Sequence, residues 1–277
     1  MPVIPARWLL GHHENNPYFA FTDACNIDGV RIILASGQAC VWYRLTLASK
    51  DGDWLIHESE TACAVVLTQL AKLGARYRLG APLHPRWLQA GWSSHFEATD
   101  HSGLRLRFDF VSRPPRITSE RLAQIWQESD SGLPAVVQPL DLVQLKRTMR
   151  LKDYPFIGAL AHVVRDPLSQ LTCDIDAQSV LDLLDAHPDL AQQLHIHRPG
   201  LAGVPRQRDL FEAAIDTEIR AARHADENRL AHYANALQPW AHHFRTLDLE
   251  GLSLADAHQQ MCEQAVGHLP DIAPQWS

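Results

Sequence analysis

The sequence predicts an α+β protein, in which a small mixed β-sheet with flanking helices is followed by an all-helical C-terminal region. Two observations support this prediction. Strand-like and helix-like hydrophobic patterns alternate through the first half of the chain. After Arg113-Pro114-Pro115 the pattern becomes helical, with breaks only at Gly and Pro. We therefore expect an α+β domain over residues 1–165 and a helical region over residues 166–277.

The first two strands are expected on either side of a short helix. Val30–Ala35 is an apolar, β-branched run typical of a buried strand, and Asp53–His57 has the same character. Between them a helix begins near Gln38. Ser59 is suited to cap a further helix that Gly74 closes. The apolar residues of that helix repeat on one face: Ala62, Val66, Leu70 and Leu73.

The remaining strands are expected at Ala75–Leu79, Ser93–Thr99 and Leu104–Val111. The last of these has the clearest alternation in the chain. Its apolar face is expected to carry Leu104, Leu106, Phe108 and Phe110, and its charged face Arg105, Arg107 and Asp109. One face of this strand should therefore be core, and the other should present charge.

The second half reads as helical from Ser119 onward. A long helix is expected over Gln207–Arg223, and His197–Pro205 has the Pro and Gly content of a linker. Helix breaks are expected near Gly132-Leu133-Pro134, Pro167, Pro188, Pro199-Gly200 and Pro239.

Composition excludes several classes of protein. With 277 residues, 46% hydrophobic and 21% charged, the chain is long and apolar enough to bury a core, so global disorder is excluded. A formal charge of −7 argues against a generally basic nucleic-acid binder. Five scattered cysteines without a C-x-x-C pair indicate reduced thiols, and no apolar run reaches the ~18–20 residues of a membrane helix. We expect a cytoplasmic protein with no membrane partner.

Sixteen histidines suggest a His-ligated metal, but their spacing does not support one. His12-His13-Glu14 has no second ligand set nearby, and His195-Ile196-His197 precedes a Pro-Gly turn in a helical region. A G-x-S-x-G elbow, a Walker A loop and a Rossmann glycine motif are all missing from the sequence. Hydrolase, ATPase and dehydrogenase functions therefore have no motif to support them.

The candidate catalytic motif is Ser49-Lys50-Asp51-Gly52-Asp53. Carboxylates two residues apart on a strand project to the same side, about 6.5–7 Å apart along the backbone. Such a pair can hold one or two Mg²⁺ ions, which promote in-line phosphoryl displacement. Asp109, on the charged face of its strand, is the candidate third carboxylate. A solvated acidic turn is the alternative interpretation of the pair.

A small-residue turn at Ser36-Gly37 precedes this motif and is suited to backbone contact with phosphate, although a plain strand–helix turn would look the same. Turn, Asp-x-Asp pair and later strand Asp together resemble the minimal nucleotidyltransferases of the polymerase-β-like superfamily. Ser49 mirrors the Thr of the Thr-x-Asp-x-Asp variant found in the branch that includes abortive-infection toxins. The resemblance covers about Val30 to Leu160.

Two departures from the family pattern stand out. Ser36 replaces the first Gly of the turn. Gly52 lies between the two carboxylates, where the family usually has an apolar β-branched residue, and is expected to loosen the strand there.

A second match lies downstream. Leu140 to Lys146, followed by Arg150-Leu151-Lys152-Asp153, resembles the branch's Asp-Leu-x-x-x-Lys helix and Arg-x-Lys-Asp turn. The resemblance implies that Lys146 faces the nucleotide phosphates, and Arg150 is expected to share its helix face as an i,i+4 neighbour. A solvated amphipathic helix is the alternative.

The resemblance implies a nucleotidyltransferase-like fold and Mg²⁺-dependent transfer of a nucleoside monophosphate from a nucleoside triphosphate, ATP or another, to an acceptor hydroxyl. Asp51, Asp53 and Asp109 would hold two metal ions, and Asp109 would also help to deprotonate the acceptor. Ser36, Gly37, Ser49, Lys146 and Arg150 would bind the nucleotide. The acceptor is left open among tRNA, protein and a small molecule, and the branch implies an antitoxin partner.

Two alternatives of another class remain at this point. One is a catalytically silent nucleotidyltransferase-like module that binds a nucleotide or a partner. The other is an interaction protein whose helical tail is its working surface.

Overall fold

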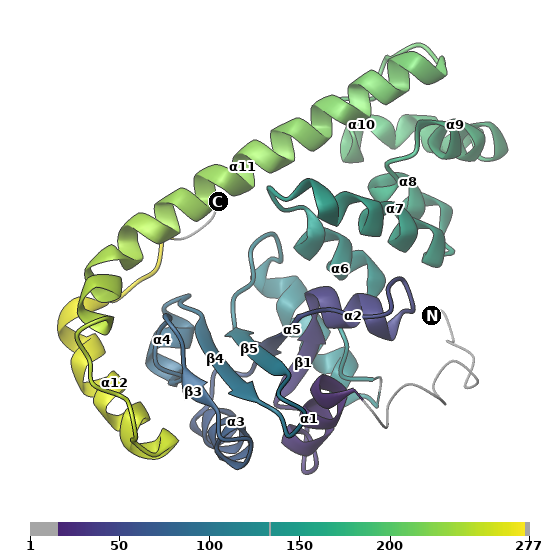
Figure 1. Ribbon diagram of the computed structural model, residues 1–277. Helices are drawn as coiled ribbons and strands as arrows, with labels where there is room; N and C mark the ends of the chain where they lie inside the picture. The colour runs from purple at the N-terminus through teal and green to yellow at the C-terminus, as the bar shows by residue number, and fades with distance from the viewer. Residues whose placement is uncertain (1–15, 133, 275–277) are drawn as a thin grey trace. The chain divides into compact units, whose positions relative to one another are not determined.

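The computed structural model describes residues 16–132 and 134–274 (Figure 1). Its described part contains a five-stranded sheet with strand order β1-β2-β5-β4-β3. The neighbours β2 and β5 run parallel, and the other three neighbouring pairs run antiparallel. This mixed sheet, its flanking helices and a long C-terminal helix confirm the α+β class.

The strands are β1 (Ile32–Ala35), β2 (Asp51–Ile56), β3 (Arg76–Tyr77), β4 (Ser94–Thr99) and β5 (Arg105–Val111). The α-helices are α1 (Pro17–Cys25), α2 (Ser36–Trp42), α3 (Glu60–Lys72), α4 (Pro85–Gln89), α5 (Ser119–Asp130), α6 (Pro139–Lys146), α7 (Tyr154–Val163), α8 (Pro167–Cys173), α9 (Ala177–Ala186), α10 (Leu194–His197), α11 (Arg208–Phe244) and α12 (Leu254–His268). Short 3-10 helices are η2 (Leu151–Asp153) and η3 (Pro188–Gln192).

Local signals set the ends of α3 as the sequence predicts. The Ser59 side chain accepts a hydrogen bond from the Ala62 N–H, which satisfies one of the free donors of the first turn. Gly74 follows the helix with a φ of +63°, a backbone conformation that glycine adopts without strain. Ala62, Val66 and Leu70 of the expected apolar stripe are buried, whereas Leu73, the C-cap residue, is 42% exposed.

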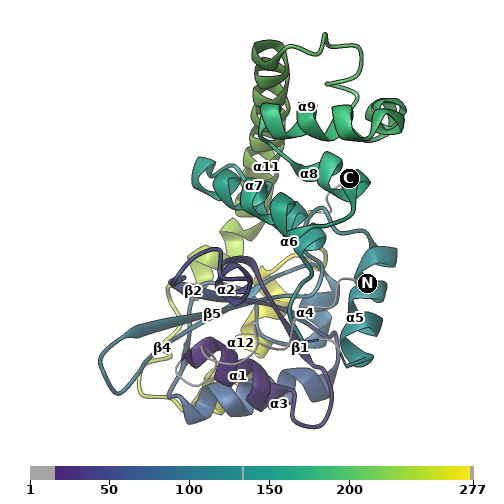
Figure 2. The same cartoon turned by 90° about the vertical axis from the view of Figure 1, so that its right-hand side faces the viewer.

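The core beneath the sheet is aromatic. Trp54 of β2 stacks on Phe108 and Phe110 of β5, with ring centroids 5.8 and 5.3 Å apart. Phe21 of α1 packs 4.9 Å from the Phe108 ring. Figure 2 shows α1 and α3 on the same side of the sheet. Because each fully buried side chain of this kind contributes about 1.5–3 kcal/mol, this packing fixes β2 against β5.

The chain divides into two compact units. Among the described residues, one unit comprises residues 16–132, 134–137 and 232–274, and the other Gln138–Ala231. The division expected between residues 165 and 166 therefore falls inside the second unit. Helix α12 belongs with the sheet, because it contacts α3 and β3.

The second unit has its own hydrophobic core among helices α8 to α11. This core includes Leu171, Val180, Leu184, Leu194, Leu201, Phe211 and Ile215, all of them buried. It is purely helical, as the sequence predicts for this stretch.

Two local expectations were wrong. Leu104 is 57% exposed and precedes β5. It lies in a turn in which the Asp100 carboxylate accepts hydrogen bonds from the N–H groups of Ser102 and Leu104. This local bonding ends the strand before Leu104 can reach the core face.

The second error concerns Pro239, which lies inside α11 and does not break it. An interior proline costs a helix about 3 kcal/mol or more. The neighbouring Trp240 is fully buried, and its Nε1 donates to the Gly80 carbonyl oxygen at 2.8 Å. Burial of this indole offsets the cost, and the helix continues to Phe244.

Candidate functional site

The three candidate carboxylates lie on one face of two adjacent parallel strands. Asp51 and Asp53 alternate along β2 with buried Gly52 and Trp54. Asp53 is the register partner of Asp109 on β5. Because neighbouring strands are about 4.8 Å apart, this register places the Asp53 and Asp109 side chains next to each other. The structure therefore brings together the three residues that the sequence singled out.

Cationic side chains contact the Asp51 and Asp109 carboxylates. The Asp109 carboxylate is 2.7 Å from Nδ1 of His95 and 3.5 Å from the Arg78 guanidinium. The Asp51 carboxylate is 3.4 Å from the Arg107 guanidinium. Over residues 16–132 and 134–274, no group of three or more His, Cys, Asp or Glu side chains is arranged as a metal centre. The Asp51 and Asp109 carboxylates are thus held by arginine and histidine in this structure.

The negative charge of the three carboxylates reaches one buried phenol. The pKa of Tyr18 is raised, first because the side chain is buried and then because Asp51, Asp53 and Asp109 are near; a hydrogen bond with the Arg107 N–H opposes the shift. This common effect on one side chain agrees with the clustering of the three acids.

A hydrogen-bonded chain extends from Asp109 across β4. Nε2 of His95 is 2.9 Å from Oγ of Ser93, which is 2.9 Å from the Tyr233 hydroxyl of α11. The Ser93 N–H donates to the same hydroxyl at 3.0 Å. When His95 is neutral, it donates from Nδ1 to Asp109 and accepts from Ser93 at Nε2. The orientation of the Asp109 carboxylate is therefore supported by three further side chains.

Sequence reasoning missed this chain. Ser93 directly precedes β4 and His95 lies within it, but only the register between β4 and β5 reveals that His95 faces Asp109. Tyr233 is 140 residues from Ser93, and no periodicity links them. The Ser-x-His spacing was the one sequence signal for this hydrogen-bonded chain, but the sequence does not show which strand pairs with the segment that contains it.

Arginines fill the rest of this surface. Glu97 of β4 accepts from Arg76 at 2.8 Å and is also bonded by Arg105. Burial alone would raise the pKa of Glu97, but the hydrogen bonds from Arg105 and Arg76 outweigh it and lower the pKa. We call this surface the charged face, and it consists of Asp51, Asp53, Arg76, Arg78, His95, Glu97, Arg105, Arg107 and Asp109.

The Ser36-Gly37 turn lies beside the start of β2. Ala35, the residue before the turn, is the register partner of Asp53. A Cβ atom on Gly37 would lie 2.1 Å from Oγ of Ser49, so a larger residue there would require the Ser49 side chain to move. Ser36 has a φ of +49°, a left-handed conformation that is uncommon for serine. The turn and Ser49 are therefore packed together next to the carboxylates.

Gly52 has a structural explanation. A Cβ atom at this position would lie 2.3 Å from the Trp54 ring and 2.5 Å from the Tyr18 ring. These two rings fill the space that a β-branched side chain would otherwise occupy. The Tyr18 hydroxyl also donates to the Lys50 carbonyl oxygen at 2.7 Å. The strand is therefore held in place at Gly52, contrary to the expectation that glycine would loosen it.

Lys146 and Arg150 lie in the second unit and share one carboxylate. Nζ of Lys146 is 3.5 Å from the Asp153 carboxylate, and Nε of Arg150 is 2.9 Å from it. The expectation that both cations share a helix face was wrong, because α6 ends at Lys146. Lys146 is only 4% exposed. Its contact with phosphates stays a prediction, and its observed partner is Asp153.

Two further histidine motifs occur in the sequence, at His12-His13-Glu14 and at His195-Ile196-His197. His195 and His197 lie on the short helix α10, and His12-His13-Glu14 is outside the described residues.

No protein-family model, curated protein or solved structure matches this chain. Within the described part of the chain, none of the helices combines the length and the apolar character needed to span a bilayer. Function has to be inferred from the geometry of the charged face and from the sequence motifs.

Proposed function

We propose that the protein is a Mg²⁺-dependent nucleotidyltransferase that moves a nucleoside monophosphate from a nucleoside triphosphate to an acceptor hydroxyl. The main support is the register of β2 and β5, which places Asp53 opposite Asp109 with Asp51 on the same face. The sequence motif predicted this clustering without knowledge of strand pairing.

The chemistry of the donor set fits Mg²⁺. The ion prefers a few carboxylate oxygens together with water and substrate phosphates. Asp51, Asp53 and Asp109 would hold it, with Arg107 and Arg78 giving up their present carboxylate contacts. When bound, Mg²⁺ offsets the negative charge that develops on the phosphates during transfer.

The side chains of the charged face have separate roles in this proposal. The acceptor oxygen attacks the α-phosphorus, the bond to pyrophosphate breaks, and Asp109 receives the acceptor proton. His95 is a positioning residue, because its Nδ1 holds the Asp109 carboxylate. Once released from the carboxylates, Arg78 and Arg107 provide positive charge for the triphosphate. Ser36, Gly37 and Ser49 border the start of β2, where phosphate contact is predicted.

A catalytically silent binding module is the second candidate, and one observation favours it. Asp51 and Asp109 are already paired with Arg107, Arg78 and His95. A face stabilised by its own cations needs no metal to persist. Such a module would bind a nucleotide or an antitoxin partner without transfer.

Label transfer separates the two candidates. The full chain is incubated with each radiolabelled triphosphate, Mg²⁺ or Mn²⁺, and in turn tRNA, cellular protein and small hydroxyl acceptors. We expect the wild type to transfer label. The transfer rate should fall at least about 100-fold in Asp51→Asn/Asp53→Asn, because the metal ligands are removed. It should not change in Asp28→Asn, whose exposed carboxylate lies outside the charged face.

Each outcome has a clear interpretation. Transfer that survives in the double variant contradicts the mechanism. Metal-dependent triphosphate binding without transfer to any acceptor favours the silent module. Absence of both transfer and metal-dependent binding overturns the proposal.

A further inference from the structure

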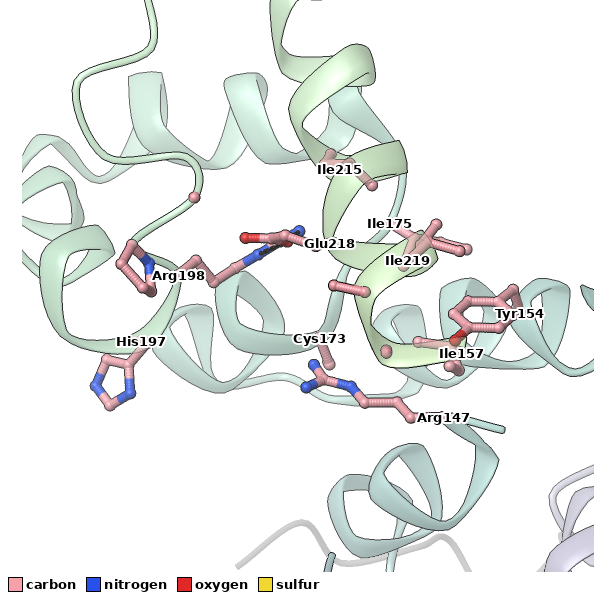
Figure 3. A pocket seen from close by; sticks show the side chains of 14 residues that line it. Arg147, Tyr154, Ile157, Cys173, Ile175, His197, Arg198, Ile215, Glu218 and Ile219 are labelled. Atoms are coloured by element: carbon pink, nitrogen blue, oxygen red, sulfur yellow. Dashed lines mark hydrogen bonds and ion pairs between the residues drawn. The ribbon is translucent and has the colours of Figure 1, made fainter. Parts of the chain in front are cut away.

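A pocket of about 300 Å³ lies within the second unit, and none of its lining residues belongs to the charged face (Figure 3). Its walls come from α7, α8, α10, α11, the C-cap residue of α6 and the segments that follow α8 and α10. Isoleucines 157, 175, 215 and 219 supply much of the apolar lining, and Arg147, Arg198 and Glu218 supply charge. This volume is at the lower end of the ~300–1,000 Å³ typical of small-molecule sites.

One of the two arginines is neutralised. Arg198 is 6% exposed, and its guanidinium donates to the Glu218 carboxylate at 2.6 and 3.1 Å. It also donates to the carbonyl oxygens of Leu171 and Asp174, at 3.2 and 2.7 Å. Figure 3 shows the Arg198 and Glu218 side chains joined. The charge and hydrogen-bonding capacity of this pair are largely used within the protein.

Arg147 has no such partner. Its guanidinium donates to the Thr172 carbonyl oxygen at 3.1 Å. Among the residues that the structure describes, no carboxylate forms an ion pair with it. Burial, and then the nearby charge of Arg198, lower the pKa of Arg147. The lining contains two arginines and one glutamate, so one positive charge is not compensated. An uncompensated charge in a half-buried site is unfavourable in free energy.

We propose that this pocket binds a small organic acid with a single negative charge and a compact apolar body. The carboxylate would bind Arg147, whose planar guanidinium suits a carboxylate, and the apolar body would pack against Ile157, Ile175 and Ile219. A single charge is favoured because Glu218 would repel a phosphate dianion. The pocket lining contains none of the residues assigned to the nucleotidyltransferase site, so the two proposals can be tested separately. Lys146 and Arg150 lie in the same unit as the pocket but do not line it.

Calorimetric titration of the full chain tests the proposal with three probes: 4-methylpentanoate, its uncharged amide 4-methylpentanamide, and inorganic phosphate. We expect one acid molecule to bind per chain. The amide should bind on the order of 10- to 100-fold more weakly, because hydrogen bonds to charged groups are worth about 1.5–3 kcal/mol. Phosphate should not bind. Equal binding of acid and amide, absence of acid binding, or stronger binding of phosphate would overturn the proposal.

Three variants locate the site. Arg147→Met should lose the preference for acid over amide. Arg220→Met removes an exposed arginine outside the pocket and should bind as the wild type does. Ala222→Leu fills part of the pocket without changing its charge and should weaken the binding of both probes. Acid binding that is unchanged in both Arg147→Met and Ala222→Leu contradicts the proposal. The two substitutions change different properties of the pocket, its charge and its volume, so a folding defect in one variant leaves the other informative.

Discussion

At the scale of single residues, the space behind β2 determines which side chains the carboxylate motif tolerates. Gly52 separates the two aspartates, and the Trp54 and Tyr18 rings occupy the position of its missing side chain. The aspartates themselves are on the opposite face of the strand. Packing on one face therefore constrains the position of the charged groups on the other.

Gly52→Ala should destabilise the protein by about 1–3 kcal/mol, because the new methyl group overpacks against two aromatic rings. Urea unfolding measures the change as a lower midpoint with an unchanged slope.

Gly267→Ala is the matched control. This glycine lies in α12, where a Cβ atom would meet nothing within 4 Å. The control should be neutral or stabilising by up to about 1 kcal/mol, since alanine is the better helix former. Equal stability of the two alanine variants would show that the rings at position 52 move aside without cost.

At the scale of elements, α12 depends on a hydrogen bond whose acceptor titrates. The Leu83 N–H donates to the Tyr77 hydroxyl at 3.1 Å, and this hydroxyl is 2.7 Å from Nδ1 of His258 on α12. Nδ1 must be unprotonated to accept from Tyr77. Burial, followed by the nearby His84, lowers the pKa of His258, while Glu60 opposes the shift.

The protein should therefore lose stability as the pH falls below about 6.5, the usual pKa of an unfolded histidine. The sign follows from the lowered folded pKa: the unfolded chain binds the proton more readily, so this contribution is complete above 6.5 and declines toward the folded pKa. Thermal unfolding from pH 8 to pH 5 measures it.

His258→Gln keeps an acceptor for Tyr77 but does not titrate, so its melting temperature should fall less than that of the wild type across this range. His101→Gln, at an exposed turn, should follow the wild type. If His258→Gln and the wild type show the same pH dependence, the titrating bond is not at α12.

Elements were predictable where the signal is local. The Ser59 cap, most of the apolar stripe of α3 and the alternation of β5 from Arg105 onward are each readable within one segment, and the structure agrees with them. The pairing of His95 with Asp109, and of α12 with β3, depends on residues far apart in the sequence. The site was therefore predictable as a set of carboxylates, while the cations that hold them were not.

At the scale of the whole molecule, two units with separate cores can be observed by separate probes. The sequence has eight tryptophans, and none lies between residues 138 and 231. Indole fluorescence thus reports the unit that contains the sheet, whereas far-ultraviolet circular dichroism reports helices in both units.

Leu184→Ala should destabilise the second unit by about 2–5 kcal/mol, because it leaves a cavity at a fully buried position. The midpoint of the circular dichroism transition should shift to a lower urea concentration, while the midpoint of the tryptophan fluorescence transition should stay the same. Leu210→Ala, at a partly exposed position on α11, is the control and should change neither transition much. Coincident shifts of both probes in Leu184→Ala would show that the units unfold as one cooperative system.

The close approach at Gly52 also has an evolutionary consequence. A homologue with a branched residue at this position needs space for the added side chain. The Trp54 and Tyr18 rings fill that space in this protein. We therefore expect divergence at position 52 to be accompanied by a smaller side chain at position 54 or 18. Substitution at these three positions should be correlated, while the neighbouring aspartates evolve under the separate demands of their own chemistry.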